Sequence, residues 1–176
     1  MSMRRSSLLL SAVALAPFAI ASAQESPGLG VPASQQEIAA WDLSVGPDGA
    51  GLPPGSGTAR AGKTVYEQKC LVCHGAEGAG QPNDRLVGGQ GTLQDANAVR
   101  TIGSYWPYAT TLFDYIRRAM PFLQPQSLSN EETYALTAYL LALNGVIAED
   151  YVIDARSLPN VVMPNRENFV VAYPGR

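Results

Sequence analysis

Cys70-Leu71-Val72-Cys73-His74 holds both cysteines and the only histidine of the 176-residue chain. In the spacing Cys-x-x-Cys-His the two thiols lie about one helical turn apart and the imidazole follows directly. This is the attachment signature of c-type haem, in which the thiols add to the porphyrin vinyl groups and the imidazole binds the iron. We therefore expect one haem c, covalently bound to Cys70 and Cys73, with His74 as an axial iron ligand. A haem of this kind predicts electron transfer.

Three alternatives account for the two cysteines less well. A thioredoxin-like redox pair needs a βαβ pattern, which the surrounding sequence lacks. A structural zinc site needs four ligands, and the motif offers three. A Cys70–Cys73 disulfide in an oxidising compartment stays open, yet it would leave His74 unexplained.

Residues 1–23 have the pattern of a secretory signal peptide. Arg4 and Arg5 form a basic start, residues 8–20 are apolar, and Ala21-Ser22-Ala23 is a small-x-small cleavage site. The apolar run is shorter than the roughly 20 residues that span a bilayer, which argues against a membrane anchor. We expect cleavage and export to the periplasm, by the general or the twin-arginine route. No other segment of the sequence is expected to span a membrane.

Charge and cysteine count restrict the function further. Without Arg4 and Arg5 the formal net charge of −3 becomes −5, so nucleic acid is not an expected partner. There is no cysteine outside the haem motif and hence no disulfide to stabilise an exported domain. A buried haem would supply much of the core instead.

The mature chain divides into three segments by composition. Residues 24–57 are rich in Gly, Pro and Ser, with a short helix expected after the Ser34 and Glu37 capping pattern. We expect this segment to wrap the domain or a partner. Residues 58–145 are expected to form an all-α haem domain. Residues 146–176 contain three prolines and are expected to form an extended tail that lies on the domain.

The haem domain is expected to contain about three core helices. Gly62 would leave room for a second helix to cross the first. The Gly-rich loop 75–104 lacks the Gly-Lys-Ser/Thr of a phosphate loop and is expected to fold around the haem. Ser129 and Glu132 form a capping box at the start of the clearest helix. The expected helices run from Thr58 to Cys70, from Thr111 to Ala119 and from Ser129 to Leu143.

The second axial position separates a carrier from an enzyme. After loss of the signal peptide only two methionines remain, Met120 and Met163. Both precede proline, but Met120 lies between the haem motif and the last helix, where a loop can cross the far haem face. We therefore favour Met120 as the sixth ligand, with Met163 or an open site as the alternatives. His/Met ligation would keep the iron six-coordinate, which suits electron transfer.

Four further residues are candidates for the haem pocket or for contacts with the propionates. Packing of the aromatic rings and solvated charge on the arginines are the alternative roles. The candidates are Trp106, Tyr108, Arg117 and Arg118.

Several motifs extend beyond what haem attachment requires. The helix with Gly62 and Tyr66, the haem motif, Met120 and the last helix together resemble class I cytochrome c. Five further stretches resemble the haem domain of the SoxD-type cytochrome c subunit: Ile38-Ala39-Ala40-Trp41-Asp42, residues 51–57, residues 88–93, residues 103–109 and Met163-Pro164-Asn165. This similarity covers residues 28–169, almost the whole mature chain.

The resemblance implies a class I cytochrome c fold and a particular partner. Proteins of this family pair with a molybdenum sulfane or sulfite dehydrogenase subunit in bacterial sulfur oxidation. Family members often carry a second haem domain, whereas this chain has a single haem motif. The implied role is a monohaem electron-transfer subunit that is not an enzyme on its own. It would pass electrons to a downstream cytochrome c or terminal oxidase. A free shuttle cytochrome and a haem enzyme with an open iron site remain the alternatives.

Overall fold

The computed structural model describes residues 28–170 and 172, so the predicted signal peptide lies outside the described residues. The chain divides into two units at residues 34 and 35, and each helix and strand of the described residues belongs to the second unit. The helical content confirms the predicted all-α class. In chain order the elements are α1 (Gln35–Trp41), β1 (Ser56–Gly57), α2 (Ala59–Lys69), α3 (Leu71–His74), η1 (Ala76–Gly78), α4 (Ala109–Ala119), α5 (Asn130–Leu143), β2 (Ile153–Asp154), η2 (Leu158–Asn160) and η3 (Arg166–Asn168).

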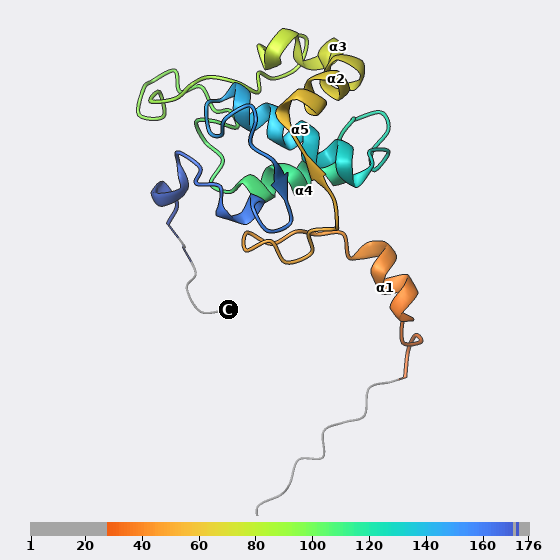
Figure 1. The fold of residues 1–176 in the computed structure, drawn as a ribbon. Helices are drawn as coiled ribbons and strands as arrows, with labels where there is room; N and C mark the ends of the chain where they lie inside the picture. The colour runs from red at the N-terminus through yellow and green to blue at the C-terminus, as the bar shows by residue number, and fades with distance from the viewer. Residues whose placement is uncertain (1–27, 171, 173–176) are drawn as a thin grey trace, which may run out of the picture. The chain divides into compact units, whose positions relative to one another are not determined.

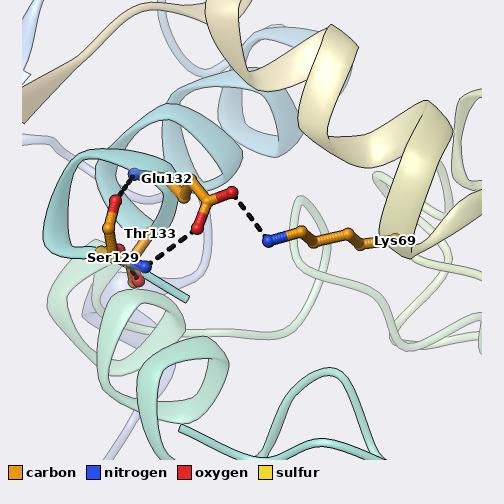
Figure 2. Close-up of polar contacts among 4 residues, drawn as sticks. All are labelled: Lys69, Ser129, Glu132 and Thr133. Atoms are coloured by element: carbon orange, nitrogen blue, oxygen red, sulfur yellow. Dashed lines mark hydrogen bonds and ion pairs between the residues drawn. The ribbon is translucent and has the colours of Figure 1, made fainter. Parts of the chain in front are cut away.

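Helix α5 is the centre of the domain and lies between α2 and α4 (Figure 1). Its residues 133–141 are all buried. The predicted capping box is present: the Glu132 N–H donates to Ser129 Oγ at 3.1 Å, and the Ser129 N–H donates to Glu132 Oε2 at 2.9 Å (Figure 2). The helix ends before Gly145, whose φ of 68° favours glycine. The sequence prediction for this helix is confirmed.

Helix α2 crosses α5 at Gly62, as the sequence predicts. A Cβ on Gly62 would lie 1.9 Å from the Ala135 carbonyl oxygen, so only glycine permits this approach. One turn further on, the Tyr66 ring packs on Tyr139 with centroids 5.3 Å apart. Figure 2 shows Lys69, at the end of α2, reaching Glu132 Oε1 at 2.7 Å. The crossing and this ion pair fix the end of α2 that leads into the haem motif.

Helix α4 begins at Ala109, two residues before the predicted start at Thr111. Tyr108 is its N-cap and makes no side-chain capping bond. The Thr110 hydroxyl instead donates to the Pro47 carbonyl at 3.3 Å. The predicted start is therefore wrong: Asp114, three residues after Thr111, accepts from the Val45 N–H at 2.9 Å and does not cap the helix start. The apolar face of α4 packs in the core, where Phe113 meets Tyr134 at 4.5 Å between ring centroids.

The segments that flank the haem domain both contribute to its packing. Strand β1 pairs antiparallel with β2, Ser56 opposite Asp154, a pairing that the sequence did not indicate. In the tail, Ile153, Leu158 and Met163 are 0, 0 and 1% exposed and belong to the hydrophobic core. Among the described residues no helix has the length and apolar character needed to cross a bilayer.

Candidate haem-binding site

Helix α3 places both thiols and the imidazole within one turn. The Cys70 N–H donates to the Tyr66 carbonyl at 2.9 Å and so closes α2, and Cys70 then caps α3. The Cys73 and His74 N–H groups donate to the Cys70 carbonyl at 3.1 and 2.9 Å. Both cysteines are free thiols. The predicted attachment group is therefore presented on a single helical turn.

The His74 ring is oriented by a main-chain acceptor. Its Nδ1 lies 3.0 Å from the Asp84 carbonyl oxygen, which can only accept a hydrogen bond. Nδ1 therefore carries the proton, and the lone pair of Nε2 remains for an iron atom. Two backbone hydrogen bonds tie the loop between His74 and Asp84 to the haem motif. The Gly80 N–H donates to the His74 carbonyl at 2.8 Å, and the Asn83 N–H donates to the Cys73 carbonyl at 2.9 Å.

The turn after His74 depends on Gly75 and Tyr66. Gly75 has a φ of 74°, and a Cβ there would lie 2.5 Å from the Gly80 carbonyl oxygen. The Tyr66 hydroxyl donates to the Gly75 carbonyl at 2.8 Å. Burial raises the pKa of Tyr66 to about 12, so this hydroxyl stays protonated and remains a donor. Tyr66 thus connects the α2–α5 crossing directly to the haem motif.

The thiol environment argues against a redox pair of the thioredoxin kind. Burial, followed by the neighbouring Cys73, raises the pKa of the Cys70 thiol to about 11. Reactive dithiols need a lowered thiol pKa, usually at a helix that follows a strand. The two strands among the described residues have two residues each, and neither leads directly into the motif, because α2 lies between β1 and α3.

The donor set also argues against structural zinc. Within residues 28–170, no three His, Cys, Asp or Glu side chains are grouped so that they could hold a metal ion. A closed zinc site needs four such ligands. Two free thiols on one turn with a single oriented imidazole fit haem c instead, because two thioethers and one axial nitrogen are all that the motif has to supply.

The two candidate methionines differ sharply in burial. Met120 is the C-cap of α4, with an extended backbone, and its side chain is partly exposed. Its N–H donates to the Ile116 carbonyl at 3.1 Å, which ties it to the helix end. Met163 is 1% exposed and lies within the hydrophobic core. Met120 is therefore the more accessible thioether.

The aromatic candidates lie at the start of α4. Trp106 is half-buried against the core and meets Tyr115 edge-to-face at 5.7 Å between ring centroids. Tyr108 is the N-cap of α4, and the Arg166 guanidinium lies 5.4 Å from its ring centroid. Both rings have protein partners, and their contact with haem stays a prediction.

The arginine candidates already have partners within the protein. Arg117 donates from one terminal nitrogen to the Leu43 carbonyl at 3.3 Å. Arg118 forms a two-point ion pair with Asp114, in which its Nε donates to Oδ1 at 2.9 Å. This ion pair raises the pKa of Arg118 above its ordinary value. These contacts favour a structural role for both arginines, and the predicted propionate contacts stay untested.

Sequence reasoning missed three residues that support the site. Asp84 acts through its main-chain carbonyl, so its side chain gave no signal. The hydroxyl of Tyr66 bonds a carbonyl that lies beyond the motif. Asp114 accepts a hydrogen bond from the Val45 N–H at 2.9 Å, a contact that joins remote parts of the chain.

The fold and the site together define a class of protein: a small helical domain with a Cys-x-x-Cys-His turn of the kind that attaches one covalent haem. The family described as cytochrome c oxidase, cbb3-type, subunit III, matches residues 57–140. Thiosulfate dehydrogenase of Psychrobacter arcticus is 32% identical over 112 residues, which are 57% of this chain and 32% of that protein. The chain thus spans about a third of the length of this curated relative.

A solved structure gives a broader match. The crystal structure of the sulfane dehydrogenase SoxCD from Paracoccus pantotrophus contains a chain that is 46% identical to this one, with a TM-score of 0.79. The match covers 85% of this chain and 73% of that chain. The chain therefore belongs to the c-type cytochromes, in the family of the cytochrome chain of SoxCD. The predicted class I cytochrome c fold and covalently bound haem c are confirmed.

Proposed function

We propose that this protein is the electron-transfer subunit of a molybdenum-dependent dehydrogenase that oxidises sulfite, sulfane or a related reduced sulfur compound. The observation that carries the proposal is the 46% identity to a chain of SoxCD over 85% of this sequence. The name of the thiosulfate dehydrogenase relative supports the same substrate class. A downstream cytochrome c or terminal oxidase would receive the electrons.

The proposed iron ligands are His74 and Met120. When bound, haem c supplies a one-electron iron couple. The Asp84 carbonyl orients the imidazole and fixes its tautomer. Met120 follows the last turn of α4 and would supply its thioether as the second iron ligand. With both axial positions filled, the iron would have no open position for a substrate, which is why we assign electron transfer rather than catalysis to this subunit.

Exposed apolar side chains next to the proposed ligands provide a surface for electron transfer. Val72, between the two cysteines, is 81% exposed, and Phe122 and Leu123, just after Met120, are 78 and 86% exposed. Apolar groups of this size on a surface often mark a protein contact. We assign these three residues to the surface that approaches a redox partner.

We narrow the proposed partner-binding part of residues 24–57 to its first half, on the contacts that the second half makes. Residues 43–57 are bonded to the protein's own helices, for example through the Tyr134 hydroxyl, which donates to the Pro53 carbonyl at 2.8 Å. Helix α1 has no buried residue, and its Trp41 is 88% exposed. We therefore place the partner-binding part of this segment in residues 24–42.

Purification of a tagged chain from its native host tests the proposal. We expect the protein in the periplasmic fraction, as the predicted signal peptide implies, together with a second subunit that contains molybdenum. Adding sulfite or thiosulfate to the complex should reduce the haem in stopped-flow spectra. Deletion of residues 24–42 should weaken the complex without loss of haem.

Other outcomes would replace this function with one of its alternatives. A lone monomer that no sulfur compound reduces through a partner would indicate a free shuttle cytochrome. A high-spin spectrum with rapid binding of cyanide or carbon monoxide would indicate a haem enzyme with an open iron site.

A further inference from the structure

The tail segment from Met163 to Phe169, which we call the C-terminal latch, lies against residues 105–108. Asn165 Nδ2 donates to the Tyr105 carbonyl at 2.8 Å, and Asn165 is only 6% exposed. A buried amide that bonds a main-chain carbonyl fixes the position of that carbonyl, because leaving either group unpaired would be costly. The contact joins the end of the chain to the segment just before α4.

The latch is itself held in one arrangement. Asn168 Nδ2 donates to Asn165 Oδ1 at 2.9 Å, which sets the orientation of the Asn165 amide. The Arg166 N–H donates to the Met163 carbonyl at 3.1 Å. The side chain of Met163 anchors the start of the latch in the hydrophobic core. Met163 thus has a packing role that is separate from iron ligation.

Two ring contacts extend the latch along the same segment. The Phe169 ring meets the Tyr105 ring edge-to-face at 5.5 Å between centroids. The Arg166 guanidinium lies over the Tyr108 ring at 5.4 Å. The latch therefore holds both ends of residues 105–108, by a hydrogen bond and a ring at one end and a cation–π contact at the other.

The latched segment leads directly into the helix that carries Met120. Tyr108 is the N-cap residue of α4, and Trp106 packs on Tyr115, nearly two turns into that helix. Met120 is the C-cap at the other end of the same 11 residues. A helix of three turns moves as a unit, so a shift of its first turn displaces Met120.

We propose that Asn165 is a positioning residue of the haem centre, which holds the Tyr105 carbonyl so that α4 presents Met120 to the iron. This inference rests on the proposed His74/Met120 ligation. Loss of one such hydrogen bond corresponds to about a tenfold change in an equilibrium constant. The affected equilibrium is the competition between the Met120 thioether and an added ligand for the iron.

Three variants test the latch in the haem-loaded protein. Asn165→Ala removes the bond to Tyr105. Phe169→Ala removes the ring contact at a residue that is 42% exposed, where folding is little affected. Asn160→Ala is the matched control, because Asn160 Nδ2 donates at 2.7 Å to the Arg156 carbonyl within the tail itself.

The measurements are imidazole binding to the ferric protein, the reduction potential and the sulfur-to-iron absorption band. We expect imidazole to bind about tenfold more tightly to Asn165→Ala than to wild type, with a lower reduction potential. Phe169→Ala should change both quantities in the same direction by less. Asn160→Ala should match wild type in all three.

Two results would overturn the inference in distinguishable ways. If wild type shows the band and neither Asn165→Ala nor Phe169→Ala alters imidazole binding or potential, the latch has no role at the haem. If Asn165→Ala does not fold, the result for Phe169→Ala decides alone: unchanged imidazole binding and reduction potential in this variant would overturn the inference. If wild type lacks the band and already binds imidazole tightly, the Met120 ligation fails, and the role of the latch fails with it.

Discussion

The two sides of the proposed iron site are built from very different stretches of chain. On the near side, Cys70, Cys73 and His74 share one helical turn. The carbonyl that orients the His74 ring belongs to Asp84, only 10 residues further along the chain. On the far side, α4 and Met120 are held by segments that lie distant in sequence, residues 43–47 and the C-terminal latch. The near side is therefore set by local sequence, whereas the far side depends on tertiary contacts.

This difference predicts two kinds of response to substitution. A change on the near side removes a ligand or an attachment point and should act in an all-or-none way. A change on the far side loosens one of several contacts with α4, so its effect should be graded. The expected effects below run from the largest to the smallest.

The largest expected effect follows His74→Ala. Loss of an axial nitrogen should reduce iron affinity by more than the roughly 10- to 100-fold that loss of an outer-shell partner costs. We expect little or no low-spin haem per polypeptide, measured by the absorption spectrum of the native protein against the total haem given by the pyridine haemochrome assay.

Asp84→Asn is the matched variant for this near-side test. Asp84 contacts His74 through its main-chain carbonyl alone, so changing the side chain should leave haem content and spectrum unchanged. A normal low-spin spectrum in His74→Ala would refute the near-side assignment.

An intermediate effect is expected on the far side for Asp114→Ala. Asp114 is 8% exposed and accepts hydrogen bonds from the Val45 N–H and from Arg118. Its loss leaves the partly buried Val45 N–H unpaired and should lower the free energy of unfolding by about 1–3 kcal/mol. Chemical denaturation of the haem-loaded protein measures this change.

Arg118→Ala separates the two contacts of Asp114. Arg118 has a side chain that is 46% exposed, so its ion pair alone should contribute about 0–1 kcal/mol. If Arg118→Ala were as destabilising as Asp114→Ala, the hydrogen bond to residue 45 would not be what fixes α4.

The smallest expected effect concerns Glu132, which supports the near side through Lys69. The hydrogen bond from Lys69, followed by that from the Ser129 N–H, lowers the pKa of Glu132. Glu132→Gln keeps a neutral capping acceptor but loses the charge. We therefore expect this substitution to lower the free energy of unfolding at pH 7 by about 0.2–1 kcal/mol.

The lowered pKa sets the pH dependence of this effect. A carboxyl with a lower pKa in the folded state stabilises the protein above its ordinary pKa of about 4.3, and this contribution disappears as pH falls through the folded value. Wild type and Glu132→Gln should therefore converge in acid denaturation profiles. Glu131 is exposed in the same turn, so Glu131→Gln should lower the free energy of unfolding at pH 7 by less than Glu132→Gln does. A constant difference between wild type and Glu132→Gln at all pH values would contradict the ion-pair role.

Local signals predicted the near side and the helices that support it. The crossing of α2 and α5 joins Gly62 to the distant Ala135, but its sequence signal is a single glycine within a helix. The capping box of Ser129 and Glu132 and the end of α5 near Gly145 depend on residues within a few positions of one another. Such features are fixed by short-range geometry, so a single sequence reveals them.

The features that sequence did not reveal depend on distant contacts. The start of α4 differs from the prediction because the Asp114 side chain accepts from the distant Val45 N–H and does not take part in local capping. The pairing of β1 with β2 involves two residues per strand, too few for an alternating pattern. The sequence also did not predict that Met163 is buried, because Met120 and Met163 both precede proline and so have the same local pattern.

The most direct test of the central claim is the near-red absorption of the oxidised haem-loaded protein. Wild type should show a weak sulfur-to-iron band near the red edge of the visible spectrum. Met120→Ala should abolish this band, whereas Met163→Leu, a substitution in the core, should retain it. A band that survives in Met120→Ala, or one that disappears in Met163→Leu while the protein stays folded, would contradict the assignment of Met120 as the second axial ligand.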